Sequence, residues 1–271
     1  MIGGVGGSGT RLIARCLKES GFYLGGDLNS AYDNLWFTLL FKRIEILSAT
    51  DVEFNTLVDI LINAMAGNNS FTDQQIKTIN LLASSDRQQH PAHWLRKQAK
   101  NLLSCTPPNR ASSRWGWKEP NTHIVIDRLA QRIQGLKYIH VARNGLDMAY
   151  SKNQNQLRLW GPHLLKNEFA ITPRCSLAYW CQVHRRVLHI GESMAGNFLF
   201  LNYDQFCVHP GNGVRQLLNF VGVQENSLLP KLEALVKQPR SIGRFKKRST
   251  NGFAEQDIAF VRSLGFDVNH C

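Results

Sequence analysis

The stretch that decides the fold is Met1-Ile2-Gly3-Gly4-Val5-Gly6-Gly7-Ser8-Gly9-Thr10-Arg11-Leu12-Ile13-Ala14-Arg15-Cys16-Leu17, a glycine-rich loop that leads directly into an amphipathic helical pattern. Because glycine has no Cβ, the backbone N–H groups of such a loop can turn inward. A helix that begins near Ser8 to Thr10 adds the positive end of its dipole. The stretch therefore predicts a cradle for phosphate or a phosphate-like anion, and a flexible glycine tract is the alternative.

The spacing Gly4-x4-Gly9 imitates a nucleotide-binding P-loop, but two key side chains differ. Thr10 stands where such a loop carries lysine, and Arg11 stands where it carries the serine or threonine that binds Mg²⁺. The sequence therefore disfavours an ATPase or kinase that works with Mg²⁺.

Length, cysteine usage and hydropathy indicate the broad class of protein. With 271 residues the chain can bury a core without disulfides or metals, and we predict a single domain over residues 1–271. The cysteines form no CxxC pair and no zinc-like spacing, which favours reduced thiols and no metal site. The apolar run Leu35 to Phe41 is too short to span a membrane, and no apolar leader is seen, so we expect a soluble, cytoplasmic protein.

The net charge of +12 implies an anionic ligand, an acidic acceptor or non-specific attraction to nucleic acid. No aromatic RNA-binding pattern, helix-turn-helix signature or zinc finger supports specific binding of nucleic acid.

Strand and helix patterns alternate in a βαβ rhythm, which predicts an α/β fold. Few apolar residues precede the glycines, so either the first strand is short or the chain starts late. After the first helix (10–20), helical periodicity continues to about residue 103, and 104–113 is expected to be a linker; this predicts a helical insertion at about 35–110. The expected strands are 114–118, 136–142 and 198–202, and the expected later helices are 121–133, 145–159, 175–194, 214–221 and 227–236, with one more at the end of the chain.

Cations follow two of the expected strands. Arg143 ends the strand 136–142, at the sheet edge where open α/β sheets bind ligands, and Ser151 could converge with it on a second anion. An ion pair of Arg143 with Asp147 is the structural alternative. Lys118 ends the strand 114–118, with a solvated strand-end charge as its alternative. The segment from Arg240 to Ser249 holds five cations in ten residues and is either a ligand-closing segment or a solvated loop.

Four blocks together resemble the P-loop sulfotransferases that use 3'-phosphoadenosine-5'-phosphosulfate (PAPS). The loop from Gly3 to Thr10 resembles their 5'-phosphosulfate loop, and Arg143 and Ser151 reproduce their Arg-x7-Ser signature for the 3'-phosphate. Lys118-Glu119-Pro120 resembles a Lys-acid-Pro motif of protein-tyrosine and related sulfotransferases. The fourth block runs from Asn202 to Pro210 and continues at 217–222.

The resemblance implies a three-layer P-loop fold with a central, mainly parallel sheet flanked by helices. It also implies in-line transfer of a sulfuryl group from PAPS to a hydroxyl acceptor, without a metal and with Lys118 stabilising charge. The residues implied in binding PAPS are Gly6, Gly7, Ser8, Gly9, Thr10, Arg11, Arg143, Ser151, Tyr203, Arg240, Ser241 and Arg244.

One cation departs from the family's pattern. The residue before Ser8 is usually lysine or arginine, whereas here it is Gly7, and Arg11 occupies a place usually held by serine or threonine. We expect Arg11 to substitute for that cation.

The sequence leaves several candidates for the general base and for the acceptor. A base must reach the acceptor hydroxyl, and Asp27, Asp33, Glu119 and His123 are candidates, with Asp33 and Asp27 ranked first. The acceptor can be a sugar, a lipid, a small molecule or a peptide. A phosphotransferase and a non-catalytic nucleotide- or phosphate-binding protein of the same fold are the alternative functions.

Overall fold

The structure is a computed structural model that describes residues 1–271 except 69, 88, 106–113, 166–168 and 270–271. Its centre is a parallel sheet of the strands β1 (Ile2–Gly4), β2 (Tyr138–Ala142) and β3 (Phe198–Asn202), in the order β1-β2-β3. The register pairs Ile2 with Ile139 and Tyr138 with Phe198. All five residues of β2 are buried, as is usual for a parallel strand that is covered on both faces.

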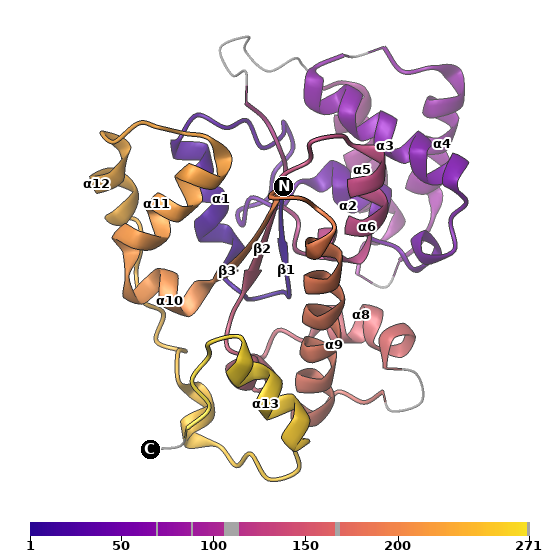
Figure 1. Ribbon diagram of the computed structural model, residues 1–271. Helices are drawn as coiled ribbons and strands as arrows, with labels where there is room; N and C mark the ends of the chain where they lie inside the picture. The colour runs from indigo at the N-terminus through magenta and orange to yellow at the C-terminus, as the bar shows by residue number, and fades with distance from the viewer. Residues whose placement is uncertain (69, 88, 106–113, 166–168, 270–271) are drawn as a thin grey trace.

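Helices cover both faces of the sheet, which gives the expected three-layer α/β arrangement (Figure 1). On one face, α1 (Thr10–Glu19) packs beside α10 (Tyr203–Val208), α11 (Pro210–Val221) and α12 (Leu228–Glu233). On the other face lie α6 (Ile126–Arg132), α7 (Gly145–Ala149), α8 (Asn155–Leu164), α9 (Pro173–Glu192) and α13 (Glu255–Ser263).

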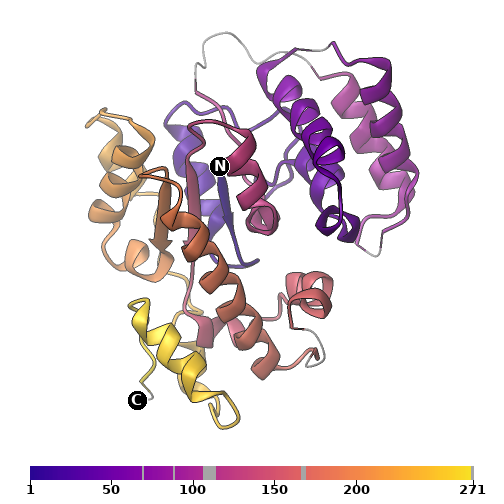
Figure 2. The same ribbon diagram turned by 45° about the vertical axis from the view of Figure 1, so that its right-hand side comes forward.

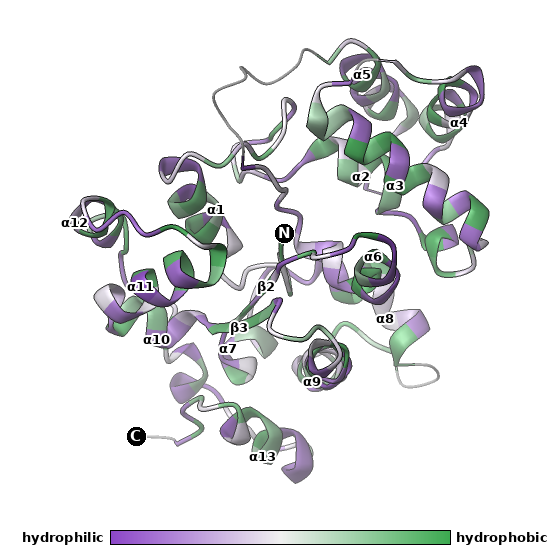
Figure 3. Cartoon of the chain, turned by 45° about the horizontal axis from the view of Figure 1, so that its top comes forward, coloured by the Kyte–Doolittle hydropathy of each residue, from purple (hydrophilic) through white to green (hydrophobic). Residues whose placement is uncertain are grey.

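Alternate residues of the central strand divide between the two layers. Ile139 and Val141 face the core that contains α1 and α11, whereas Tyr138 and Ala142 face the core that contains α9. Green and purple segments both occur along α11 and α13 in Figure 3, as expected for amphipathic helices that bury one side.

The expected helical insertion consists of α2 (Leu35–Phe41), α3 (Asp51–Ala66), α4 (Asp73–Ser84) and α5 (Ala92–Leu103). These helices lie together beside the sheet and its covering helices in both views (Figures 1 and 2). A capping box between Thr72 and Gln75 begins α4. Most of the predicted linker 104–113 lies outside the described residues.

The prediction of a regular strand at 114–118 is wrong. The structure has only two isolated parallel bridges there, between Ile2 and Lys118 and between Tyr23 and Trp115. The segment bonds to β1 through Ile2 N–H to Trp117 O and Glu119 N–H to Ile2 O. Beyond Lys118 the segment turns into a 3-10 helix that begins at Pro120, so no regular ladder forms.

Two predicted helices are each divided. The range 121–133 covers most of the 3-10 helix η2 (Pro120–Ile124) and then α6, and the range 145–159 covers α7 and the first half of α8. The break between α7 and α8 is stabilised by Gln154, whose amide donates to the carbonyls of Met148 and Ser151. These two carbonyls are therefore satisfied without the backbone N–H groups that a continuous helix would supply one turn later.

Candidate active site

The glycine loop between β1 and α1 is closely surrounded by backbone and ring atoms. Gly4 has φ +154°, and a Cβ there would lie 2.4 Å from the carbonyl oxygen of Val141. Gly9 has φ +99°, and its Cβ would lie 2.1 Å from the ring of Tyr203. Only glycine fits this backbone path, which explains two of the loop's glycines.

Several donors of the loop have no partner among the residues that the structure describes. The N–H of Ser8 bonds to the carbonyl of Val5 at 3.0 Å, but the Ser8 hydroxyl is buried and has no partner in the described part of the chain. Within the described ranges, no backbone hydrogen bond occupies the N–H groups of Gly6, Gly7, Gly9, Thr10 and Arg11. Buried or clustered donors without partners are costly unless a ligand satisfies them, and a helix N-terminus favours an anion.

Thr10 and Arg11 start the helix that follows. Thr10 is its first residue and is buried, whereas Arg11 is exposed. Arg11 forms no ion pair with any residue that the structure describes.

Arg143 follows β2 and is 7% exposed. Its Nη2 donates to the hydroxyl of Ser241 at 2.8 Å, and its Nε lies 3.8 Å from a carboxylate oxygen of Asp204. The alternative ion pair with Asp147 is therefore wrong, because Asp147 accepts instead from the backbone N–H groups of Gly243 and Phe245. Burial is the main cause that raises the pKa of Asp204.

The basic segment after residue 240 packs against α7 and is not simply a solvated loop. Arg244 donates to the carbonyl of Tyr150 at 3.1 Å, and Ser241 meets Arg143 as described. Arg240 is exposed and lines a cavity together with Ser241, Arg244 and Lys247. The segment therefore brings further cations next to Arg143.

Ser151 and Tyr203 both border the glycine loop. A Cβ on Gly7 would lie 3.9 Å from the Ser151 hydroxyl, which accepts a hydrogen bond from the N–H of Asn153. Tyr203 is 8% exposed and packs its ring against Gly9. The structure gives no direct contact between Ser151 and Arg143; both lie next to α7, one before it and one after it.

Lys118 and Asp33 form an ion pair beside β1. The Lys118 side chain is buried, and its ammonium contacts a carboxylate oxygen of Asp33 and donates to the carbonyl of Ala31 at 3.2 Å. The side chain of Asp33 is 21% exposed, so it is the more accessible partner. The bridge between Ile2 and Lys118 places this pair close to the start of the glycine loop.

The other candidate bases lie in different surroundings. Asp27 accepts from the amide of Asn101 on α5 at 2.9 Å, so it contacts the helical insertion and not Lys118. Glu119 is buried, accepts from the side-chain amide of Asn121 at 2.9 Å, and has its pKa raised by burial. His123 is 1% exposed, and burial lowers its pKa to about 3. Only Asp33 is both partly exposed and in contact with Lys118.

The sequence did not predict the polar contacts that side chains in and just before α8 make with the glycine loop. The side-chain amide of Gln156 donates to the carbonyl of Gly4 at 3.2 Å, although the two residues are 152 positions apart. A Cβ on Gly6 would lie 3.4 Å from the amide nitrogen of Asn153. A single polar residue in a helical pattern gives no signal for such a contact.

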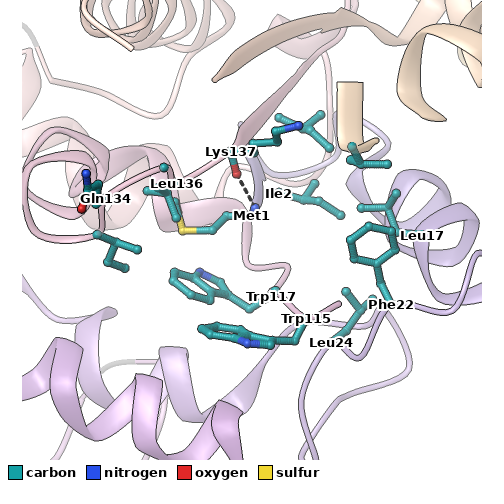
Figure 4. Close-up of a pocket in the computed structure, with 15 residues that line it drawn as sticks. Met1, Ile2, Leu17, Phe22, Leu24, Trp115, Trp117, Gln134, Leu136 and Lys137 are labelled. Carbon is teal, nitrogen blue, oxygen red and sulfur yellow. Dashed lines mark hydrogen bonds between the residues drawn. The ribbon is translucent and has the colours of Figure 1, made fainter. Parts of the chain in front are cut away.

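An apolar cavity of about 280 Å³ lies at the other end of β1 (Figure 4). The indoles of Trp115 and Trp117 and the side chain of Ile2 form part of its wall, and the amino nitrogen of Met1 donates to the carbonyl of Lys137 at 2.6 Å. None of the anion-binding candidates lines this cavity.

In the described ranges, no three His, Cys, Asp or Glu side chains are arranged to hold a metal ion. Among the helices that the structure describes, none is long and apolar enough to cross a membrane.

Comparison with known proteins identifies the family. Residues 1–227 match the model of the sulfotransferase family. The structure resembles the sulfotransferase domain of a Synechococcus olefin synthase, with 14% identity, a TM-score of 0.51, and coverage of 99% of this chain and 94% of that one. It also resembles the sulfotransferase STF9 of Mycobacterium avium, with 15% identity, a TM-score of 0.45, and coverage of 99% and 76%. Curated protein sequences give no match.

The family match covers the glycine loop, the Lys118 segment, Arg143 and Tyr203, and the similarity to the olefin synthase domain gives the same α/β fold. The chain belongs to the sulfotransferase family.

Proposed function

We propose that the protein transfers a sulfuryl group from PAPS to a hydroxyl acceptor by in-line displacement. The observation that carries the proposal is the bridge between Ile2 and Lys118, which sets the backbone of the buried Lys118 beside the strand that leads into a loop of unpartnered donors. Backbone donors at a helix start suit a phosphosulfate group, and a neighbouring cation suits the charge that develops when the sulfur–oxygen bond breaks.

Two groups of residues bind the donor nucleotide in this proposal. Gly6, Gly7, Ser8, Gly9, Thr10 and Arg11 hold the 5'-phosphosulfate. The 3'-phosphate is held by Arg143 and Ser151, with Tyr203, Arg240, Ser241 and Arg244 completing the nucleotide site. The existing bond from Arg143 to the Ser241 hydroxyl supports this assignment, because it already aims a buried guanidinium at the basic segment.

The transfer itself needs a base and an electrophilic donor. The bound PAPS supplies the sulfuryl group and adenosine 3',5'-bisphosphate as the leaving group. Asp33 takes the proton of the acceptor hydroxyl, whose oxygen forms the new bond to sulfur. Lys118 donates to the bridging oxygen while its bond to sulfur breaks, so Lys118 must exchange Asp33 for the donor. Asp27 is the second candidate base. No metal is required.

Nucleotide titration tests the proposal. Adenosine 3',5'-bisphosphate is expected to bind without Mg²⁺ in isothermal titration calorimetry, and labelled PAPS is then used to screen sugar, lipid, phenolic and peptide-tyrosine hydroxyls. Binding of ATP that requires Mg²⁺, without binding of the bisphosphate, would identify a phosphotransferase. Binding of neither nucleotide would reject both enzymes and leave a protein that kept only the fold.

A further inference from the structure

The carbonyl of Gly4 is held by a side chain from a distant part of the chain. Gln156 lies in the first turn of α8, is 6% exposed, and donates its amide N–H to the Gly4 carbonyl at 3.2 Å. Gly4 is the last residue of β1 and the first residue of the glycine loop. This bond therefore acts where the strand turns into the loop.

The other end of the same amide is fixed by a histidine. The Nε2 of His123 lies 3.2 Å from the side-chain oxygen of Gln156. Since the Gly4 carbonyl can only accept, the amide nitrogen of Gln156 must face it, and the amide oxygen must face a protonated Nε2 of His123. Burial keeps the imidazole neutral, which leaves this orientation unchanged over the physiological pH range.

Beyond the pairing of Gly4 with Val141 in the sheet and the bond from the Ser8 N–H to the Val5 carbonyl, the loop's peptide planes have few partners in the described part of the chain. Gly6, Gly7 and Gly9 have no side chains to pack, and Gly4 has a backbone that only glycine readily adopts. A rotated peptide after Gly4 would break the bond to Gln156 and turn the carbonyl to the opposite side of the chain. An anion is bound by N–H groups and repelled by carbonyl oxygens. The orientation of the Gly4 carbonyl therefore affects how tightly the glycine loop binds an anion.

We propose that Gln156 is a positioning residue that holds the Gly4 carbonyl away from the anion and so keeps the loop's N–H groups directed at the 5'-phosphosulfate. This inference rests on the proposed function. A second contact supports it: Trp160, one turn further along α8, donates to the side-chain oxygen of Asn121 at 2.7 Å. The helix thus also holds the η2 segment that follows Lys118.

The test compares a nucleotide that carries the 5'-phosphate with one that lacks it. Gln156→Met keeps the size of the side chain but removes the donor, and Gln156→Glu still accepts from His123 but adds a negative charge beside the Gly4 carbonyl. We expect Gln156→Met to weaken adenosine 3',5'-bisphosphate about three- to tenfold, the range of one lost neutral hydrogen bond, and Gln156→Glu to weaken it more than tenfold. Adenosine 3'-monophosphate, which does not occupy the loop, should bind within about twofold of wild type.

Gln98 provides the matched control. It is 2% exposed on α5 and has no bond to the loop, so Gln98→Met and Gln98→Glu should leave the affinity for both nucleotides unchanged. Thermal melting of every variant identifies any that do not fold. If Gln156→Glu does not fold, the test rests on Gln156→Met.

Three outcomes are distinguishable. Selective loss of bisphosphate binding supports the inference. Wild-type bisphosphate affinity in Gln156→Met, or an equal loss for both nucleotides, would overturn it while the proposed function stands. Failure of the wild-type protein to bind the bisphosphate would reject the proposed function and this inference with it.

Discussion

Lys118 and Asp33 meet as a buried ammonium and a partly exposed carboxylate, although 85 residues separate them. The pair is held on both sides, because the backbone of Asn34 donates to the Lys118 carbonyl and Lys118 bridges to Ile2. An ammonium and a carboxylate from distant parts of the chain are therefore adjacent.

Lys118→Ala is expected to lower turnover at least about 100-fold, because Lys118 acts on charge that develops in the transition state. The affinity for adenosine 3',5'-bisphosphate should change far less. Steady-state kinetics and calorimetry measure the two quantities. Lys137→Ala, which removes an exposed ammonium near Phe220, serves as the control and should keep full turnover. Near wild-type turnover of Lys118→Ala would show a merely structural charge.

Arg143→Ala is expected to weaken 3'-phosphorylated nucleotides at least tenfold and to leave adenosine 5'-phosphosulfate nearly unaffected. A charge-assisted hydrogen bond to phosphate is worth about 1.5–3 kcal/mol, which sets this magnitude. Ser241→Ala removes only the hydroxyl that Arg143 contacts and should have a smaller effect. Equal losses for both nucleotides in Arg143→Ala would contradict the assignment to the 3'-phosphate.

Arg11→Ala is expected to reduce sulfuryl transfer strongly, and Arg11→Lys is expected to retain most of it, because the loop has no cation at Gly7. An arginine at position 7 is not an equivalent substitute, since Gly7 has φ +97° and a side chain there would be strained. The rate of transfer at saturating PAPS measures the effect. Full activity in Arg11→Ala would show that backbone donors suffice.

Gly9→Ala is expected to abolish nucleotide binding or folding, because its Cβ would lie 2.1 Å from the Tyr203 ring. Gly196 is the matched control: it also has a positive φ, of +82°, but its Cβ would meet nothing within 4 Å. Gly196→Ala therefore reports the backbone strain alone. Equal melting temperatures and equal nucleotide affinities for the two variants would contradict the close packing of Tyr203 on the loop.

Stability is expected to fall as the pH drops below about 6.5, the ordinary pKa of histidine. Burial lowers the pKa of His123 to about 3 and of His184 to about 4, and it holds the pKa of His140 well below its usual range. The unfolded chain therefore binds more protons than the folded one between these values, so each histidine destabilises the fold on acidification.

The expected slope reaches about 1.4 kcal/mol per pH unit for each such histidine. Melting temperatures measured from pH 7.5 to pH 5 check this, and His184→Phe should flatten the curve. His189→Gln changes a histidine whose side chain is 85% exposed and should leave the curve unchanged. A flat wild-type curve would contradict the prediction.

Several features could be predicted from the sequence because they depend on neighbours along the chain. The glycine loop and the helix from Thr10 to Glu19 follow from local backbone freedom and apolar spacing. The strand before Arg143 follows from its mostly apolar residues on either side of His140, as expected for a buried parallel strand. The family resemblance rests on these same local motifs and agrees with the family match.

Other features were decided only by the tertiary structure. The sequence predicts a strand from 114 to 118, but this segment pairs through single bridges and then turns into a 3-10 helix at Pro120. It predicts one helix over 145–159, but the Gln154 side chain satisfies carbonyls at the break. The sequence leaves an ion pair between Arg143 and Asp147 as an alternative. In the structure the basic segment packs so that its backbone N–H groups donate to the Asp147 carboxylate instead.

The candidate site divides in the same way. Residue types and spacing determined which residues are candidates for binding an anion, because glycine freedom, helix dipoles and strand-end cations are local properties. Only the fold decided that Lys118 meets Asp33 while Asp27 meets Asn101, and that Gln156 reaches the Gly4 carbonyl. Contacts between residues 74 to 152 positions apart depend on how helices and strands pack, and no local pattern records that packing.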